Sequence, residues 1–137
     1  MPPEQVAEIR DWLYRARLDE WSAERLLSAE PPIIETALFH SQQLAETAFK
    51  AFLTYRGIPF ARTHELARLV SLCETTDATF ATLMAMANDL SAYAVRFRYP
   101  TQVPTPSLEV AQVRLAWARH IQAFVLDRLP PSVRSKR

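Results

Sequence analysis

Apolar residues recur every three to four positions along this chain, in long stretches that contain neither proline nor glycine. The first stretch runs from about Glu4 to Glu30, and the second, with a wider apolar face, from about Ile33 to Arg56. This spacing keeps apolar side chains on one face of an α-helix. The pattern therefore predicts two long amphipathic helices, separated at Pro31-Pro32, where a helix cannot continue.

Three further helices are expected after the second one. A short helix begins near Thr63, a longer one runs from Asp77 to about Arg98, and a last one begins at Ser107. Thr, Asp and Ser are good N-cap residues because their side chains accept a hydrogen bond from a free backbone N–H group. No alternating pattern typical of strands occurs. The sequence thus predicts an all-α fold, an antiparallel up-and-down bundle of four to five helices.

Length and composition narrow the possibilities. The chain has 137 residues, a net charge of +1, one cysteine and one glycine. We expect a single domain over residues 1–130, followed by a basic, disordered tail over 131–137. Because the net charge is close to zero, any nucleic-acid binding must come from a local patch. No signal peptide and no apolar run of about 18 residues is evident, so we expect a cytoplasmic protein that does not span a membrane.

The single glycine, Gly57, fits the left-handed position that closes the second helix. Glycine-rich phosphate loops are excluded, since their backbones need several glycines. The single cysteine, Cys73, excludes an intramolecular disulfide and a cysteine zinc site, and its apolar neighbours indicate a core thiol. The three histidines do not share a spacing typical of metal ligands, so we predict no metal site.

Polar residues form a stripe on the second helix, with His40, Gln43, Glu46 and Lys50 at helical spacing. One interpretation is a polar site that faces a ligand or a partner. The other is a solvated helix face with one Glu46–Lys50 ion pair, which would stabilise the helix by roughly 0.2–0.5 kcal/mol.

A basic and aromatic cluster ends the expected fourth helix, at Arg96, Arg98 and Tyr99. Arginine binds phosphate in a bidentate manner and tyrosine can stack on a base, so this cluster is a candidate phosphate site. The alternative is that the arginines only complement the negative end of the helix dipole before Pro100 stops the helix.

Arg114 and His120 are weak catalytic candidates in the last helix. A histidine general base and an arginine that stabilises a phosphorane would suit metal-independent RNA cleavage. Six residues of continuous helix place the two side chains about 120° apart, so they would converge only at a dimer interface or a helix break. The alternative is an exposed arginine and an unrelated histidine.

The most informative motif is Phe39–Leu53, FHSQQLAETAFKAFL, followed by Arg62-Thr63-His64-Glu65-Leu66 and by Arg98-Tyr99-Pro100. In this order and spacing, the motifs resemble the HEPN domain family, named for higher eukaryotes and prokaryotes, nucleotide-binding. The family's helix carries Gln-Gln and Ala-Glu-Lys, which Gln42-Gln43 and Ala45-Glu46 match, with Thr47 where lysine is usual. The resemblance covers about Ile9 to Leu126.

The resemblance implies a small helical bundle that dimerises, often beside a minimal nucleotidyltransferase in a prokaryotic toxin–antitoxin pair. Other members are ribonucleases with Arg-x4–6-His near the start of the last helix, a spacing that this chain has only at Arg114 and His120, well inside that helix. Our leading hypothesis is therefore a homodimeric module without a cofactor, weakly catalytic at most, that binds a nucleotide or RNA phosphate. The candidate ligand residues are Arg96, Arg98, Tyr99, Gln43, Lys50 and His64. The alternatives are a metal-independent ribonuclease toxin and a ligand-free scaffold or adaptor.

Overall fold

The computed structural model describes residues 1–100 and 103–134, and every regular element in these ranges is helical. The α-helices are α1 (Pro3–Ser28), α2 (Ile34–Arg56), α3 (Leu66–Glu74), α4 (Met84–Ser91) and α5 (Leu108–Leu126). The short 3-10 helices are η1 (Ala78–Leu83), η2 (Ala92–Ala94) and η3 (Pro131–Val133). The predicted all-α helical bundle is confirmed. No helix in the described ranges is both long and apolar enough to cross a bilayer.

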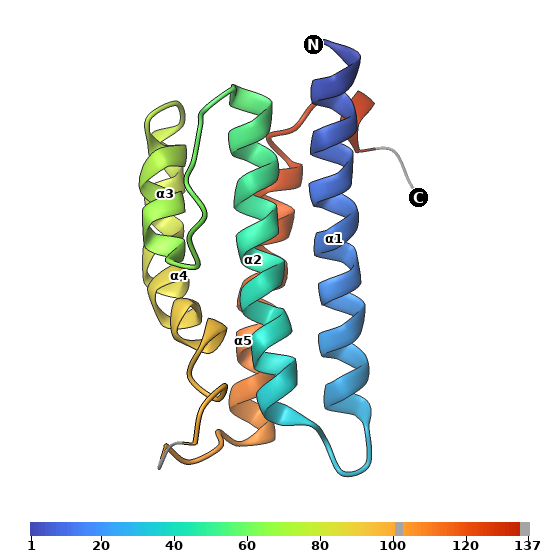
Figure 1. Cartoon of the computed structure of the whole chain (residues 1–137), viewed down its shortest axis with the longest axis vertical. Coiled ribbons are helices and arrows are strands. Elements are labelled where there is room, and N and C mark those ends of the chain that lie inside the picture. The colour runs from blue at the N-terminus through green and yellow to red at the C-terminus, as the bar shows by residue number, and fades with distance from the viewer. Residues whose placement is uncertain (101–102, 135–137) are drawn as a thin grey trace.

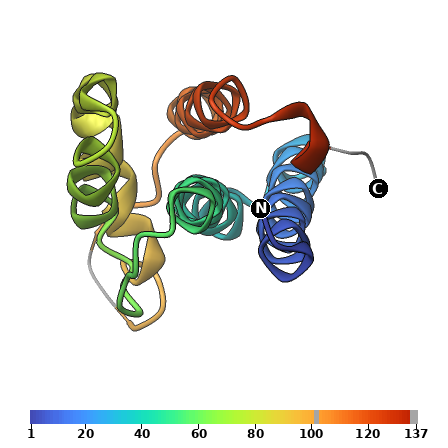
Figure 2. The same cartoon turned by 90° about the horizontal axis from the view of Figure 1, so that it is seen from above.

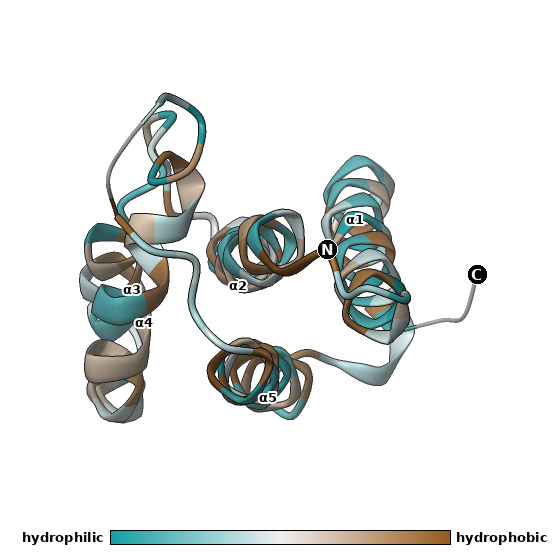
Figure 3. Ribbon diagram, turned by 90° about the horizontal axis from the view of Figure 1, so that it is seen from below, coloured by the Kyte–Doolittle hydropathy of each residue, from teal (hydrophilic) through white to brown (hydrophobic). Residues whose placement is uncertain are grey.

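The central element of the bundle is α2. Helix α1 runs antiparallel to it on one side, α5 lies behind it, and α3 and α4 cover the opposite side from α1 (Figures 1 and 2). Each helix carries both hydrophilic and hydrophobic positions, as an amphipathic element should (Figure 3). Because α2 has neighbours on most of its circumference, its buried positions extend around nearly the whole helix, from Ala37 to Leu53.

Aromatic rings from three elements meet in the core. The Phe80 ring of η1 lies 4.4 Å from the Phe52 ring of α2 and 5.0 Å from the Phe124 ring of α5, measured between centroids. Phe80 is fully buried. Such ring pairs add about 0.5–1.5 kcal/mol each to the stabilisation that burial provides. This cluster joins the α3–α4 layer to the two long central helices.

Most of the predicted helix ends are confirmed. Gly57 adopts φ 69°, and its N–H group donates to the carbonyls that end α2. The Ser107 side chain accepts from the Val110 N–H group at 3.2 Å, and Asp77 accepts from the Thr79 N–H group at 3.0 Å. The prediction for Thr63 is wrong. Helix α3 begins only at Leu66, and the Thr63 hydroxyl accepts from the Glu65 N–H group within the preceding segment.

The fourth helix is not continuous from Asp77 to Arg98 as predicted. Its first part is the 3-10 helix η1, in which Phe80 and Leu83 are both buried. Residues three apart lie on one face of a 3-10 helix, so this geometry directs both side chains into the core. After α4 the chain tightens again into η2 and leaves helical geometry at Val95, with φ −132°. Arg96 and Arg98 therefore lie beyond the last helical residue.

The predicted disordered tail is wrong for its first residues. Residues 131–133 form η3, the Val133 side chain is fully buried, and an Arg10 guanidinium nitrogen donates to the Ser132 carbonyl oxygen at 2.6 Å. Burial of the Val133 side chain therefore holds the end of the described chain against α1. The rest of the predicted tail, residues 135–137, lies outside the described residues.

Candidate functional site

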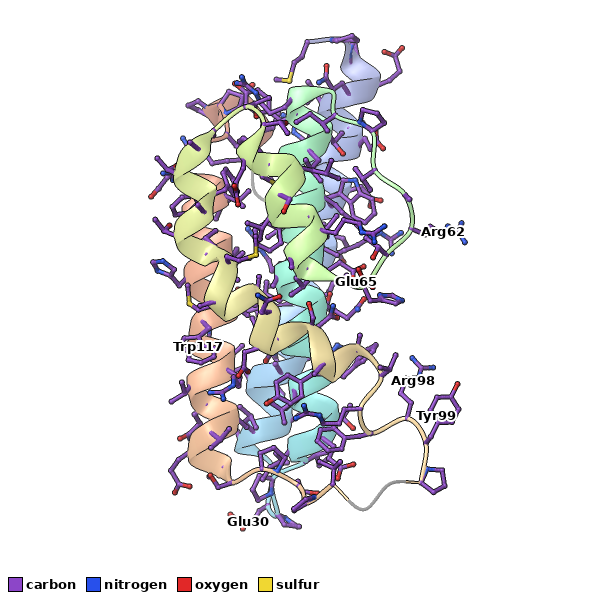
Figure 4. The ribbon with its side chains drawn as sticks, turned by 90° about the vertical axis from the view of Figure 1, so that its left-hand side faces the viewer. Glu30, Arg62, Glu65, Arg98, Tyr99 and Trp117 are labelled. Carbon is purple, nitrogen blue, oxygen red and sulfur yellow. The ribbon has the colours of Figure 1, made fainter. Side chains whose placement is uncertain are left out.

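A large groove opens between the first half of α1, the second half of α2 and the segment 57–65. Its volume is about 1240 Å³. It is lined by Gln5, Glu8, Trp12, Lys50, Leu53, Thr54, Gly57, Ile58, Pro59, Phe60, Arg62, Thr63 and His64. In Figure 4 the segment 57–65 passes along one edge of the bundle, with Arg62 extended away from it into solvent.

The segment 57–65 forms this groove because it runs back along α2 after the helix ends. Gly57 reverses the chain in a left-handed conformation, and the Ile58 N–H group donates to the Leu53 carbonyl oxygen at 2.9 Å. The Phe60 ring then packs on Trp12 of α1, with centroids 6.2 Å apart. The segment ends at the middle of α2, where the Gln42 amide donates to the His64 carbonyl oxygen at 3.2 Å.

Two residues of the polar stripe of α2, Glu46 and Lys50, are buried beneath this segment, whereas Gln43 is partly exposed and His40 pairs with Asp19 of α1 at 2.8 Å. Glu46 is only 4% exposed and Lys50 only 8%. The Lys50 ammonium donates to Glu46 Oε2 at 2.8 Å, while Gln42 and His64 contact Glu46 Oε1 at 3.2 and 2.9 Å. We call Gln42, Glu46, Lys50 and His64 the Glu46 network. The predicted Glu46–Lys50 pair is therefore present, but in the interior of the bundle.

Electrostatics favours the ionised form of Glu46. Burial by itself raises the pKa of this carboxyl, but the hydrogen bonds from Lys50 and His64 outweigh burial and hold the pKa below its ordinary value. Lys50 gains further stabilisation from two aromatic rings, since its ammonium nitrogen lies 5.4 Å from the Trp12 centroid and 5.8 Å from the Phe60 centroid. At the base of the groove, the charge of Lys50 is therefore balanced by the buried carboxylate of Glu46.

His64 contacts the buried Glu46 carboxylate and is also exposed to solvent. Its Nδ1 lies 2.9 Å from Glu46 Oε1, although the side chain is 62% exposed. A carboxylate can only accept hydrogen bonds, so Nδ1 carries the proton and Nε2 is left to accept from a ligand, or to donate to one when the ring is protonated. Gln43 belongs to the same neighbourhood, because its amide donates to Gln42 Oε1 at 2.6 Å. The structure therefore brings Gln43, Lys50 and His64 together around one carboxylate.

The other three predicted ligand residues lie elsewhere on the same side of the molecule. The Arg98 guanidinium sits 5.8 Å from the Phe39 ring, above a cavity of about 280 Å³, and Arg96 sits 5.2 Å from the Tyr93 ring. Tyr99 is 75% exposed and projects outward beside Arg98 (Figure 4). Phe39 and Lys50 are eleven residues apart on α2, or about 16 Å along its axis. The six predicted ligand residues thus form two separate groups rather than one site.

The structure does not bring Arg114 and His120 together. Helix α5 continues without a break through both positions. Arg114 forms an ion pair with Asp89, at 2.6 Å from Nε to Oδ1, and its guanidinium stacks 4.1 Å from the Trp117 centroid. His120 is exposed, with the Phe124 ring 6.5 Å away. Arg114 is thus held in a structural contact that does not include the histidine.

Several residues of the site were not among the predicted ligand residues, among them Trp12, Phe60, Arg62 and the buried Gln42 and Glu46. The Trp12 indole Nε1 is buried without a hydrogen-bond partner among the described residues. Arg62 lines the groove and makes no ion pair within the described ranges. Arg62 was named in the motif Arg62-Thr63-His64-Glu65-Leu66 but not as a ligand residue, because the path of the segment 57–65 is a tertiary property.

The single cysteine has ordinary surroundings for a core thiol. Cys73 is fully buried, and burial together with the nearby charge of Asp77 raises the pKa of its thiol far above the ordinary value. The thiol therefore stays protonated and behaves as a small apolar side chain. Among residues 1–100 and 103–134, no group of three or more His, Cys, Asp or Glu side chains is placed to hold a metal ion.

Comparison with known proteins places the fold. A crystal structure of TT1696 from Thermus thermophilus superimposes with a TM-score of 0.76 at 31% identity, covering 88% of this chain and 98% of that chain. ST0689, an archaeal HEPN homologue, superimposes with a TM-score of 0.68 at 25% identity, covering 88% of this chain and 96% of that one. No curated protein matched this chain. The family model described as "HEPN domain" matches residues 9–129, which span most of the bundle and most of the groove, so this chain belongs to the HEPN domain family.

Proposed function

We propose that this protein is a non-catalytic binding module for a nucleotide or for a short stretch of RNA, and that the groove beside α2 holds the ligand. The observation that carries the proposal is the pairing of aromatic and cationic side chains on one open surface. Trp12 and Phe60 supply ring faces, while Arg62 and His64 supply groups that can bind phosphate.

Each part of a nucleotide has a matching group in the groove. A base can stack against the Trp12 and Phe60 rings. The exposed Arg62 guanidinium is free to bind a phosphate in a bidentate manner. Glu8, on the rim, can accept from ribose hydroxyls. The Arg98 and Tyr99 group is a second contact for a longer RNA that extends along α2.

The absence of an assembled catalytic set among the described residues favours binding over cleavage. One version of the ribonuclease alternative needs Arg114 and His120 at one phosphate, yet Arg114 is paired with Asp89; the other needs Arg98 together with a histidine from a second copy of the chain. If the protein were a ligand-free scaffold, neither the groove nor the exposed Arg62 that lines it would have a binding role. We therefore favour the binding module.

A direct test is calorimetric titration of the protein with AMP, ATP and a short single-stranded RNA. We expect saturable binding of at least one of them, weakened about tenfold or more in Arg62→Gln, because a charge-assisted phosphate contact contributes about 1.5–3 kcal/mol. Arg68→Gln is the matched control, since Arg68 is exposed on α3, pairs with Glu65 and does not line the groove. Absence of heat with every ligand would instead favour the scaffold.

The proposal includes a cytoplasmic homodimer that acts with a minimal nucleotidyltransferase, as membership of the family suggests. Two large apolar side chains on α1, Leu18 and Trp21, are 40% and 42% exposed and lie about one helical turn apart, where a second copy could cover them. Gel filtration with light scattering should give twice the chain mass. A strict monomer at high concentration would remove the dimer from the proposal. Co-purification with a co-expressed minimal nucleotidyltransferase tests the partner.

A further inference from the structure

A second cavity lies beside the first turns of α2, away from the groove. Its volume is about 280 Å³. It is lined by Glu35, Thr36, Phe39, Tyr93, Phe97 and Arg98. The first three of these residues belong to α2, Tyr93 belongs to η2, and the last two follow η2 along the chain. The cavity is thus assembled by the fold, and its size suits a small ligand.

Three aromatic rings form the walls of this cavity. The Tyr93 and Phe97 rings stack with their centroids 6.3 Å apart, and the Phe39 ring lies 5.8 Å from the Arg98 guanidinium. Tyr93 is only 5% exposed, yet its hydroxyl has no hydrogen-bond partner among the described residues. The rings favour an apolar ligand body, and a ligand that offers the hydroxyl a partner would satisfy a nearly buried polar group.

Two opposite charges border the cavity without pairing with each other. The Arg98 guanidinium makes no ion pair within the part of the chain that the structure describes. The Glu35 carboxylate accepts from the Thr105 hydroxyl through one of its oxygens. A phosphate group would place two or more negative charges beside Glu35, which is unfavourable. A ligand with one cationic and one anionic group matches both side chains.

We propose that this cavity binds a free α-amino acid with an apolar side chain, such as leucine, methionine or phenylalanine. Arg98 binds the α-carboxylate, for which a guanidinium has matching geometry, and the Tyr93 hydroxyl is a further donor to it. Glu35 accepts from the α-ammonium group, and the apolar side chain packs against the rings. This site is separate from nucleotide binding in the groove. Because the amino acid uses Arg98, it competes with RNA for this second contact.

Calorimetric titration of the full chain with L-leucine, L-methionine and L-phenylalanine tests the site. We expect saturable binding of at least one of them. Two analogues of the amino acid that binds best then isolate the charges, namely the carboxylic acid that lacks the ammonium group and the amine that lacks the carboxylate. Each analogue should bind about tenfold more weakly or worse, because it leaves Glu35 or Arg98 without its partner.

Variants decide whether this cavity is responsible. Arg98→Gln should weaken amino-acid binding about tenfold or more, and because Arg98 is exposed the fold should persist. Arg68→Gln makes the same charge change outside the cavity, where Arg68 pairs with Glu65, and should bind within about twofold of wild type. Arg62→Gln should do the same, which separates this site from the groove.

Three results would overturn the proposal. The first is a wild type that binds none of the three amino acids, and the second is an equal effect of Arg98→Gln and Arg68→Gln. The third is binding of AMP that Arg98→Gln abolishes and Arg62→Gln does not, which would assign the cavity to a nucleotide instead.

Discussion

The Glu46 network allows a quantitative test of how α2 is stabilised. Glu46→Gln keeps the size of the side chain but removes its negative charge. Lys50 then remains only 8% exposed without a counter-charge. Removing one partner of a buried ion pair costs about 3–5 kcal/mol, because the remaining charge is both desolvated and unpaired. We expect Glu46→Gln to lower the free energy of unfolding by about 3 kcal/mol.

Lys50→Met should be less destabilising and should lower the free energy of unfolding by about 1–2 kcal/mol. In that variant Glu46 still accepts hydrogen bonds from Gln42 and from His64. The double variant removes both charges, so it should be less destabilised than the sum of the single changes, by about 2 kcal/mol. Urea unfolding followed by circular dichroism measures all three. Additive effects, or a loss below about 0.5 kcal/mol in Glu46→Gln, would refute the description of a coupled buried pair.

The pH dependence of stability has a defined sign at this site. The pKa of Glu46 in the folded protein is below its ordinary value of 4.5. Its contribution to stability is therefore complete above about pH 4.5 and is lost as the pH falls through the lower folded value. Wild type should lose stability over this acidic range more steeply than Glu46→Gln. Equal slopes would mean that Glu46 is not held in its ionised form by its neighbours.

Three further predictions concern the core and the chain reversal. Phe80→Ala should destabilise the protein by about 3–5 kcal/mol in urea unfolding, because it empties the space between three helices, and a loss under about 1 kcal/mol would contradict the packing. Gly57→Ala should lower the free energy of unfolding by about 1 kcal/mol, because φ at this position is 69°. Gly57→Asn should lower it less. Equal stability of Gly57→Ala and the wild type would exclude the left-handed turn. The Cys73 thiol should react with Ellman's reagent only at the rate of unfolding, because it is buried and its pKa is raised; prompt reaction in native buffer would disprove its burial.

The sequence was sufficient for those parts of the fold that depend on local chemistry. Apolar periodicity located α1, α2 and α5, and Gly57 ends α2 and Ser107 begins α5 as expected. Continuity of the fourth helix was predicted wrongly, because a spacing of three at Phe80 and Leu83 suits both a 3-10 helix and an α-helix. Only packing against α2 and α5 distinguishes the two.

The candidate site could be predicted from the sequence only in part. Glu46 and Lys50 were identified as polar residues of α2, yet their burial depends on the segment 57–65 passing over them, and no local pattern encodes that path. His64 contacts Glu46 although eighteen residues separate them. Trp12 joins the site for the same reason, since the Phe60 ring brings the segment onto α1. Arg96 and Arg98 were predicted from their basic and aromatic cluster and, for Arg98, from the Arg98-Tyr99-Pro100 motif. Neither pattern shows how far the cluster lies from Lys50 in the folded chain.

The central claim is that the groove beside α2 holds a nucleotide against the Trp12 ring. The chain has three tryptophans, so three indole N–H signals are expected in a ¹⁵N–¹H spectrum. Titration with the nucleotide that binds best by calorimetry should shift the Trp12 indole signal, since this buried N–H group belongs to a residue that lines the groove. The signals of Trp21 and Trp117, which lie outside the groove, should stay in place. Saturable binding that leaves the Trp12 signal unchanged would contradict the account.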